Sequence, residues 1–471
     1  MATWHLWLSW LALLGLVIIL HLVVSTEAFW KRLRYLLIIG VLKGAGATTF
    51  SWYIYPFDWL GIESRAIQLL VLFICWSTVA VSIGLGFALV LGSYRDWLQE
   101  HKLMVISLFP AAFVLAEVTG SLFFSLYSLG PGSAPNVHFA FGHVGYALGH
   151  APLTASVAQW GGVYFASMVI TTAACALYLF FQSHQHRLVA IGVLVVLTII
   201  CFGSYVYFEQ DQPLDLTITS INTQFDSELL STAAGRATKA EETLVAVRMV
   251  LTANNQNYVI LPEDSRFTTS FASPEAAMAF IQTYSTSTIL IDSARVTNTS
   301  GEVVLRSYIY DSSNRQIYTV DKEYLVPSGE FIPYLSDFVL HQLAEPATIT
   351  TITSRLAYRS GSGIIEPTPP NRIPTILFCS ESVSPLITMS RLKNHQSSFI
   401  VHLVSHGWFN TPRILEHQTE AMLRMHAVAS NRSLVVAANM SEGYLLTPEG
   451  QKKNGVLINE AVHWSIWQYE I

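Results

Sequence analysis

The chain has 471 residues, of which 52% are hydrophobic and only 12% are charged, and this length gives room for about three average domains. A chain this apolar is not an ordinary soluble protein, and its net charge of −6 with no run of Lys and Arg argues against a nucleic-acid partner. Its four cysteines, three of them inside apolar segments, exclude a disulfide framework. The charge is unevenly spread. Residues 1–208 carry little of it, whereas residues 209–471 have the composition of a globular domain.

Residues 1–208 contain six segments long enough to cross a bilayer, a length of about 20 apolar residues in a helix. The first is too long and too rich in Trp for a cleaved signal peptide, and no small-residue cleavage site follows it. We therefore predict a polytopic helical bundle of about six helices. The six segments are 4–24, 35–55, 66–91, 103–127, 157–181 and 188–208.

The loops between these segments predict an orientation. Three alternate loops are basic, whereas residues 128–159 contain no Lys or Arg and the loop before the third segment is mixed. The positive-inside rule places the basic loops in the cytoplasm. Six crossings then put the amino terminus and the whole of 209–471 on the extracytoplasmic side. The basic loops carry Lys31, Arg32 and Arg34, then Arg95 and Lys102, then Arg187; the mixed loop carries Asp58, Glu63 and Arg65.

Two charges lie inside the predicted spans, where ionisable residues are costly and often functional. Lys43 is expected to snorkel to the cytoplasmic face. For Glu117 two interpretations stay open, a role in a polar cavity of the bundle and simple helix pairing. The following loop contains His138, His143 and His150, whose spacing fits no helical metal face, so we expect a wet interfacial loop there.

After residue 211 the pattern changes to strands alternating with amphipathic helices, which predicts an α/β domain with its active residues at strand ends. The polar run 348–353 is expected to begin a surface excursion. The predicted strands are 216–221, 258–261, 288–292, 303–310, 375–378, 399–404 and 434–438. The predicted helices are 233–251, 274–284, 334–343 and 411–429.

Three reactive side chains fall at predicted strand ends. Cys379 closes the apolar run 373–379 and is the only cysteine outside the hydrophobic segments, while Glu263 and Lys322 each follow another strand. A carboxylate can take the proton of a thiol, and only the thiolate is a good nucleophile. An ammonium group beside the thiol lowers its pKa and stabilises the oxyanion of a tetrahedral intermediate. Each residue alone is explained by an exposed or core position, but together they predict an active site.

Other polar residues near this trio have candidate roles. The backbone N–H of Ser380 is a candidate second oxyanion donor, and Glu330 is a candidate for orienting Lys322 or sharing its proton. His402 and His406 lie four apart on a strand and share a face, but no third ligand with suitable spacing accompanies them. No metal is therefore expected.

The order Glu263, Lys322, Cys379 resembles the carbon–nitrogen hydrolase, or nitrilase, superfamily, whose catalytic residues are Glu, Lys and Cys in this order. The run Leu-Val-Pro-Ser-Gly-Glu-Phe-Ile-Pro at 325–333 narrows the match. It resembles the Leu-Val-Pro-Phe-Gly-Glu-Tyr-x-Pro run of the bacterial apolipoprotein N-acyltransferases.

Further motifs extend this resemblance over most of the chain. Ser-His-Gly-Trp-Phe at 405–409 is similar to that family's Asn-Asp-x-Trp-Phe. In the membrane half, Gly-Tyr-Ala-Leu-Gly at 145–149 and Gln-Trp-Gly-Gly-Val-Tyr-Phe at 159–165 resemble its Gly-Tyr…Gln…Gly-Gly-Val-Tyr-Gly stretch.

The resemblance implies an αββα sandwich for 209–471 and multi-pass insertion in the bacterial cytoplasmic (inner) membrane. It implies that Cys379 attacks a phospholipid ester, forms an acyl thioester, and passes the acyl chain to the N-terminal amine of a diacylglyceryl-cysteine apolipoprotein, with no cofactor. Trp408 and Phe409 would line the acyl or lid region, although an aromatic core pair explains them as well.

The sequence also departs from the family. The usual Tyr after the nucleophile is Ser380, the usual Glu of the following helix is replaced by Ala429, and a usual Gly is Ser441. The family commonly closes with another membrane helix, and none is expected within 209–471. Two alternatives therefore stay open: a membrane-anchored amidase or thioesterase with water as acceptor, and a catalytically weakened lipoprotein-binding relative.

Overall fold

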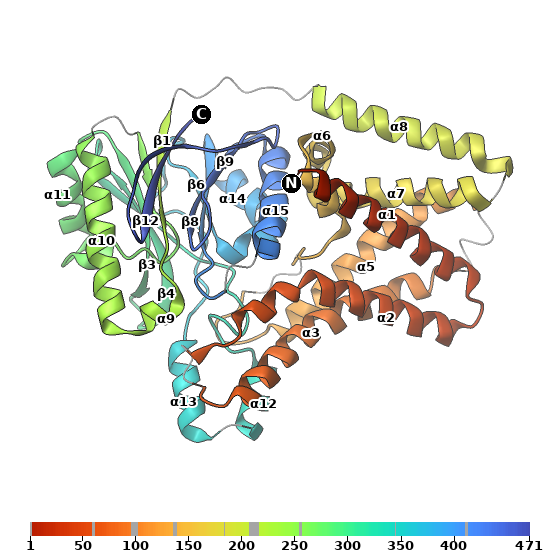
Figure 1. The fold of residues 1–471 in the computed structure, drawn as a ribbon, viewed down its shortest axis with the longest axis horizontal. Coiled ribbons are helices and arrows are strands. Elements are labelled where there is room, and N and C mark those ends of the chain that lie inside the picture. The colour runs from red at the N-terminus through yellow and green to blue at the C-terminus, as the bar shows by residue number, and fades with distance from the viewer. Residues whose placement is uncertain are drawn as a thin grey trace.

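The computed structural model describes residues 2–58, 62–95, 102–134, 139–182, 184–206, 216–253, 257–343, 345–409 and 413–471. It shows a helical bundle lying beside a helix-covered pair of β-sheets (Figure 1). The predicted domain boundary at 208–209 lies outside the described residues, between the last bundle helix, which ends at Val206, and the first strand, which begins at Thr217.

Within the described residues the bundle has six long helices that run back and forth between the sheets and the far end (Figure 1). Four of them are long and apolar enough to cross a membrane. The first helix is apolar along Leu11–Ser25, the part whose side chains the structure describes, and the second carries four basic residues, so the count of six spans stays a prediction. The helices are α1 (Ala2–Ser25), α2 (Phe29–Ala47), α3 (Arg65–Gly92), α5 (Val105–Tyr127), α7 (Gly162–Gln182) and α8 (Arg187–Val206).

Small residues let the bundle helices approach closely. A Cβ added to Gly40 of α2 would lie 2.7 Å from the Cα of Gly84 in α3, so neither helix could come this near with a larger residue. Between α5 and α7 the chain forms the short helices η4 (Val144–His150), α6 (Pro152–Ala155) and η5 (Ser156–Trp160). These lie at the end of the bundle that faces the sheets.

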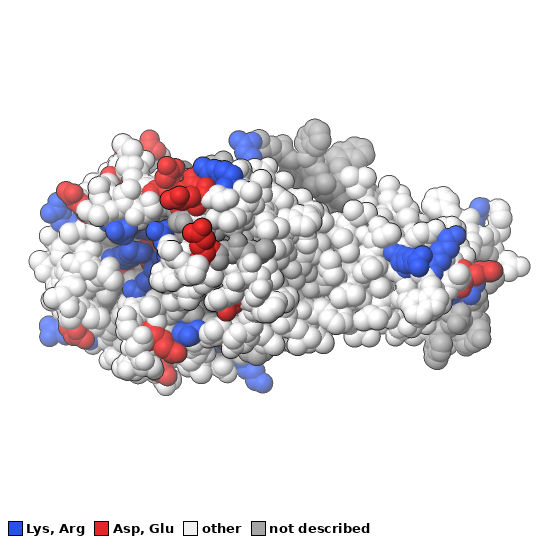
Figure 2. Space-filling view, turned by 90° about the horizontal axis from the view of Figure 1, so that it is seen from below, with Lys and Arg blue, Asp and Glu red and all other residues white. Residues whose placement is uncertain are grey.

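The predicted basic loops gather at the opposite end of the bundle (Figure 2). There the buried guanidinium of Arg32 donates to the carbonyl oxygens of Gly92 and Thr26, each at 2.8 Å, where α3 and α1 end. A cation at helix carboxyl ends is favoured by the helix dipoles. The three basic loops thus share one face, as the sequence predicts. Which compartment this face meets stays a prediction.

Residues 217–471 form two sheets that join at one point. The first sheet has the order β11-β12-β1-β2-β3-β4-β5 and the second the order β6-β7-β8-β9-β10, and β1 meets β8 only where Thr223 pairs with Asn439. The strands are β1 (Thr217–Thr223), β2 (Tyr258–Ile260), β3 (Ile289–Thr297), β4 (Val303–Asp311), β5 (Gln316–Asp321), β6 (Thr375–Phe378), β7 (Phe399–Ser405), β8 (Ser433–Asn439), β9 (Tyr444–Leu446), β10 (Lys452–Lys453), β11 (Val456–Glu460) and β12 (Trp464–Glu470).

The two sheets pack face to face with helices outside. Ile260 and Ile291 of the first sheet share a core with Phe378 and Val401 of the second. Two helices, α10 and α11, cover the outer face of the first sheet, and α14 and α15 cover that of the second. This is the predicted αββα sandwich. Its helices are α9 (Ser227–Ser231), α10 (Ala233–Thr252), α11 (Pro274–Tyr284), α12 (Tyr334–Leu343), α13 (Pro346–Arg355), α14 (Pro385–Asn394) and α15 (Arg413–Ser430).

Each predicted strand and helix of this half is present, and several further elements are not among those predicted. The polar run 348–353 lies at the surface, but as part of helix α13, which begins at Pro346 and buries Ile352. The strand expected before Lys322 is β5, for which no range was predicted, and it forms one edge of the first sheet. The unpredicted strands β9, β10, β11 and β12 are short or partly exposed, and β10 and β11 form sheet edges. Helix α14 begins at Pro385, directly after the turn that contains Cys379.

Candidate active site

The ends of three strands, from both sheets, carry the predicted trio to one cavity. Glu263 follows β2, Lys322 follows β5, and Cys379 follows β6 and begins the single turn η8 (Cys379–Val383). The Nζ of Lys322 lies 2.9 Å from Oε1 of Glu263 and 2.8 Å from Oε1 of Glu330. Only 1% of the Lys322 side chain is exposed, so one buried ammonium group holds two carboxylates.

The electrostatics of this group suit proton transfer. Burial raises the pKa of Glu263 to about 7, with the charge of Glu330 adding to the rise and Lys322 opposing it. Burial would lower the pKa of Lys322, but the two carboxylates hold it above its ordinary value. Burial and the charge of Glu263 raise the pKa of Cys379 to about 12. The resting thiol is therefore protonated and needs a base, and Glu263 is a group that can both take and return a proton near neutral pH.

The loop 325–333 holds Glu330 in position. The backbone N–H of Val326 donates to Oε2 of Glu330 at 2.7 Å. Ser328 at the loop's tip has a positive φ of 61°, a conformation that non-glycine residues rarely adopt. A Cβ added to Gly329 would lie 2.8 Å from the ring of Trp408, so the indole packs directly on this loop.

Glu381 is a residue of the site that sequence reasoning missed. Its carboxylate is fully buried and forms a two-pronged ion pair with Arg391 of α14 at 2.5 Å. It also accepts the backbone N–H groups of Phe378 (2.9 Å) and Glu323 (2.7 Å). Glu381 thus ties the turn that carries Cys379 to the residue after Lys322. An acid two residues after the cysteine was the available signal, but its partners lie too far along the chain to pair by sequence.

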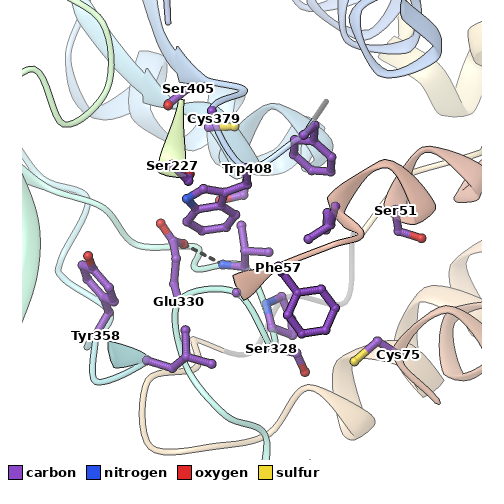
Figure 3. A pocket seen from close by; sticks show the side chains of 18 of the residues that line it. Ser51, Phe57, Cys75, Ser227, Ser328, Glu330, Tyr358, Cys379, Ser405 and Trp408 are labelled. Atoms are coloured by element: carbon purple, nitrogen blue, oxygen red, sulfur yellow. Dashed lines mark hydrogen bonds between the residues drawn. The ribbon is translucent and has the colours of Figure 1, made fainter. Parts of the chain in front are cut away.

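A cavity of about 690 Å³ opens beside the trio. Glu263, Lys322, Glu330 and Cys379 all line it. Figure 3 shows Cys379, Glu330 and Trp408 on the sandwich side of this cavity, with Phe57 and Cys75 of the membrane half opposite. The apolar part of the wall comes from both halves. The bundle and its loops contribute Ile54, Ile62, Ile67, Leu70, Val71, Ile74, Val79, Phe124, Phe139 and Phe141, and the other half contributes Ile332, Val339, Leu340, Ile352 and Leu356 among others.

The other predicted site residues have distinct surroundings. The hydroxyl of Ser380 donates to the carbonyl oxygen of Tyr324 at 2.6 Å, so this residue also joins the turns that follow β5 and β6. Trp408 lines the cavity. Phe409 lines it too, and its ring lies 5.8 Å from that of Phe50 in the membrane half. Phe409 therefore both lines the cavity and contacts an aromatic ring of the membrane half.

Asn439 and the two departures Ala429 and Ser441 are built into the sandwich. Asn439 accepts from the hydroxyl of Thr223 (2.8 Å) and from the N–H of Phe225 (2.9 Å), and it donates to the hydroxyl of Ser405 (3.0 Å). Ala429 and Ser441 are both half-buried. Asn439 therefore closes the point where the two sheets meet.

The buried histidines next to the cysteine turn remain neutral. His402 lies with Nε2 3.3 Å from the carbonyl oxygen of Cys379, and burial lowers its pKa to about 3. Burial lowers the pKa of His406, which lines the cavity, to about 4. In the part of the chain that the structure describes, no three His, Cys, Asp or Glu side chains gather as a metal site.

The membrane bundle contains a second charged group, and it corrects two predictions. Lys43 does not reach toward the basic end of the bundle. Its Nζ donates to Glu117 at 2.9 Å and to the carbonyl oxygen of Gly142 at 2.7 Å. His143 is buried 3.8 Å from Glu117 rather than in a wet loop. His138 lies outside the described residues. Because Glu117 also accepts from the hydroxyl of Ser167 at 2.9 Å, it joins α2, α5, α7 and the loop before η4.

Comparisons with known proteins agree with this arrangement in part. No family model matches the chain. It is similar to an apolipoprotein N-acyltransferase of Bradyrhizobium diazoefficiens, with 29% identity over 149 residues, which are 31% of this chain and 26% of that relative. The match therefore spans about a quarter of the curated relative.

Solved structures give weak likenesses. A carbon–nitrogen hydrolase from Helicobacter pylori G27 covers 53% of this chain and 89% of its own, with a TM-score of 0.38 and 12% identity. An amidase from Nesterenkonia sp. covers 56% of this chain and 93% of its own, with a TM-score of 0.36 and 11% identity. At these TM-scores the fold assignment rests on the sheets and helices described above.

Proposed function

We propose that the protein is a membrane acyltransferase in which Cys379 takes an acyl chain from a phospholipid and passes it to the N-terminal amine of a diacylglyceryl-cysteine lipoprotein. One observation carries the proposal. A thiol and a lysine held by two carboxylates line a cavity whose apolar wall includes side chains of the membrane helices α3 and α5. A soluble amidase would have no need of such a wall, whereas an acyl chain would fill it. The similarity to an N-acyltransferase supports the same activity.

In the first half of the reaction the Sγ of Cys379 attacks the ester carbonyl carbon. Its proton passes to Glu263 as the new bond forms, and the ammonium group of Lys322 stabilises the oxyanion. When the tetrahedral intermediate collapses, the ester C–O bond breaks and Glu263 returns the proton to the departing alkoxide. The products are a lysophospholipid alcohol and an acyl thioester on Cys379.

In the second half the acceptor's free amine attacks the thioester carbonyl. Glu263 takes a proton from the amine, Lys322 again stabilises the oxyanion, and the C–S bond breaks. The thiolate regains a proton and the lipoprotein carries an amide-linked acyl chain. Glu330 acts in both halves by holding Lys322, to which it is bonded at 2.8 Å.

The proposed place of this reaction is the outer surface of the bacterial cytoplasmic membrane. In support, the basic loops share the end of the bundle opposite the sandwich (Figure 2), and basic loops favour the cytoplasm. The cavity then opens where lipid-borne donors and acceptors meet the sandwich.

The test is acylation by the purified full chain in detergent, given phospholipid and a diacylated lipopeptide and followed by mass spectrometry. We expect a triacylated lipopeptide and a transient acyl adduct on Cys379. Replacing the nucleophile, Cys379→Ala, should reduce product formation by at least about a thousandfold. Cys75→Ala is the matched control, because Cys75 lines the same cavity and should be dispensable.

Other outcomes would redirect the assignment. Fatty acid released without acylated peptide would indicate a hydrolase with water as acceptor. Bound lipopeptide with no adduct and no product would indicate the binding relative. Undiminished turnover in Cys379→Ala would remove this thiol from the chemistry.

A further inference from the structure

The charged residues that line the cavity are unevenly balanced. Six are cations and three are carboxylates, so the wall carries an excess of positive charge in a chain whose net charge is −6. Figure 2 shows Lys and Arg side chains gathered around a hollow in the sandwich half. The cations are Arg236, Lys239, Arg266, Arg295, Lys322 and Arg355, and the carboxylates are Glu263, Asp264 and Glu330.

Asp264 holds two of these cations next to the catalytic carboxylate. It follows Glu263 directly, and both its oxygens accept from Arg266, each at 2.9 Å. Arg295 lies 3.0 Å from the same carboxylate and stacks on the ring of Tyr358 at 5.1 Å. One carboxylate therefore orients two guanidinium groups, and one positive charge is left over. A guanidinium has five N–H donors, so both retain donors that Asp264 does not use.

The backbone beneath these arginines is fixed. Asp264 and Arg266 both have positive φ, of 56° and 66°. The N–H of Asp264 donates to the hydroxyl of Ser293 at 2.8 Å, and the buried Lys239 donates to the carbonyl oxygen of Asp264 at 2.8 Å. Strained backbone held by several bonds is found at binding and catalytic sites. The turn thus presents Arg266 in one position and adds the charge of Lys239 beneath it.

We propose that Arg266 and Arg295 form an anion subsite that binds the phosphate of a phospholipid headgroup while the acyl chains occupy the apolar wall of the same cavity. This inference rests on the proposed function, and it specifies which of the two substrates binds to the subsite. The diacylated acceptor bears no phosphate, whereas the donor bears one close to its ester bonds. Guanidinium groups match phosphate oxygens in geometry and charge.

The subsite should also favour donors with a net negative headgroup over zwitterionic ones. The leftover positive charge of the Asp264 group, together with Lys239, meets one phosphate charge in either donor. A zwitterionic headgroup adds an ammonium group that these cations repel. We therefore expect phosphatidylglycerol to bind more tightly than phosphatidylethanolamine of the same chain length.

The test measures equilibrium binding to the full chain in detergent, carrying Cys379→Ser so that no turnover occurs. The probes are dihexanoyl-phosphatidylglycerol, dihexanoyl-phosphatidylethanolamine, dihexanoylglycerol and inorganic phosphate. Replacing both arginines, Arg266→Gln with Arg295→Gln, should weaken binding of phosphatidylglycerol by at least about tenfold, the effect of losing a hydrogen bond to a charged group. Binding of dihexanoylglycerol should not change. The control is Arg248→Gln, since Arg248 is exposed on α10 and does not line this cavity.

Three results would overturn the inference. In the double variant, the affinity for dihexanoylglycerol could fall as much as that for phosphatidylglycerol, or the affinity for phosphatidylglycerol could stay unchanged. The third result is a fall in affinity for inorganic phosphate alone, which would assign the subsite to the free ion. Should the double variant misfold, the salt dependence of the native chain decides. Raising salt from about 0.05 M to about 0.5 M should weaken binding of phosphatidylglycerol but not of dihexanoylglycerol, because salt screens exposed charges. Failure of acyl transfer with this preference intact would reject the proposed function and leave the subsite standing.

Discussion

In each half of the molecule a lysine is bonded to a buried glutamate. In the bundle, Lys43 pairs with Glu117. Both oxygens of that carboxylate are occupied, because Val144 and Ser167 also donate to it. In the sandwich, Lys322 pairs with Glu263 and Glu330 in the wall of a cavity that also contains Cys379.

The two lysines differ in the number of carboxylates that each one holds, and this number bears on whether the group can exchange a proton. The bundle pair has one carboxylate per cation and joins three helices and a loop, so its bonds are used for packing. The sandwich group has two carboxylates per cation, and burial raises the pKa of Glu263 to about 7. It can therefore exchange a proton at neutral pH, and the thiol of Cys379 lines the same cavity. Buried ion pairs are weak evidence for stability, and the unequal pairing in the sandwich supports its proposed role in proton transfer.

Removing each lysine tests this comparison most severely. Lys322→Met leaves two buried carboxylates without their cation, so we expect a loss of about 3 kcal/mol in the free energy of unfolding and a loss of at least about a hundredfold in acyl transfer. Lys43→Met should also lower the unfolding temperature, but activity per folded molecule should persist. Thermal unfolding and lipopeptide acylation in the same detergent give both quantities. Equal loss of specific activity in the two variants would contradict the distinction.

The ion pair of Glu381 with Arg391 offers a third case to set beside the two lysine pairs. It ties together the turns after β5 and β6, and Glu381 does not line the cavity. Glu381→Gln leaves Arg391 buried with no counter-charge and weakens the link between the turns after β5 and β6. We expect about a tenfold loss of kcat with little change in KM, since the productive geometry would be populated less often. Glu420→Gln on α15 removes a carboxylate paired with Arg424 and Lys452 away from the cavity. That control should keep its kcat.

The smallest effect near neutrality is the pH dependence of the reaction. Because Glu263 must be ionised to accept a proton and its pKa is about 7, the rate should fall by about half between pH 8 and pH 7, by about fivefold between pH 7 and pH 6, and by about tenfold for each further unit of acid. Glu263→Gln should lose most activity and this profile with it.

The same group gives stability the opposite trend. The folded pKa of Glu263 lies above the ordinary 4.5, so the folded state binds this proton more tightly than the unfolded chain does. The contribution of this proton to the free energy of unfolding is complete below pH 4.5 and declines as the pH rises to 7. Unfolding midpoints of the native chain and Glu263→Gln across this range should converge toward acid. Parallel curves would show that the carboxyl does not titrate in the range.

Local patterns in the sequence were enough to predict the sandwich strands that carry the trio. Strands β2 and β6 are short apolar runs, and they end where the side chains of Glu263 and Cys379 begin the next turn. Period and composition specify such elements. The edge strands β10 and β11 are exposed along their whole length, so no hydrophobic pattern distinguishes them.

Pairings between distant residues were beyond local patterns. Nothing in the sequence near Lys43 indicates that Glu117, 74 positions away, accepts a hydrogen bond from its ammonium group. The expectation that Lys43 snorkels followed from considering each charge alone. The brace from Glu381 to Glu323 spans 58 positions. Such contacts depend on how strands and helices meet in space, which no window of sequence contains.

Hydrogen bonds join the two halves at several points, and this limits how the protein can be handled. Gln418 of α15 donates to the carbonyl oxygen of Ala47 at 3.0 Å, Arg424 donates to that of Gly149 at 2.5 Å, and the N–H of Ala140 donates to the oxygen of Val383 at 2.9 Å. A sandwich expressed without its bundle would expose the apolar surface of α15 and would lose the part of the cavity wall that the bundle provides. Truncated water-soluble versions should therefore aggregate, and inhibitor screening has to begin from the intact chain in a lipid mimetic.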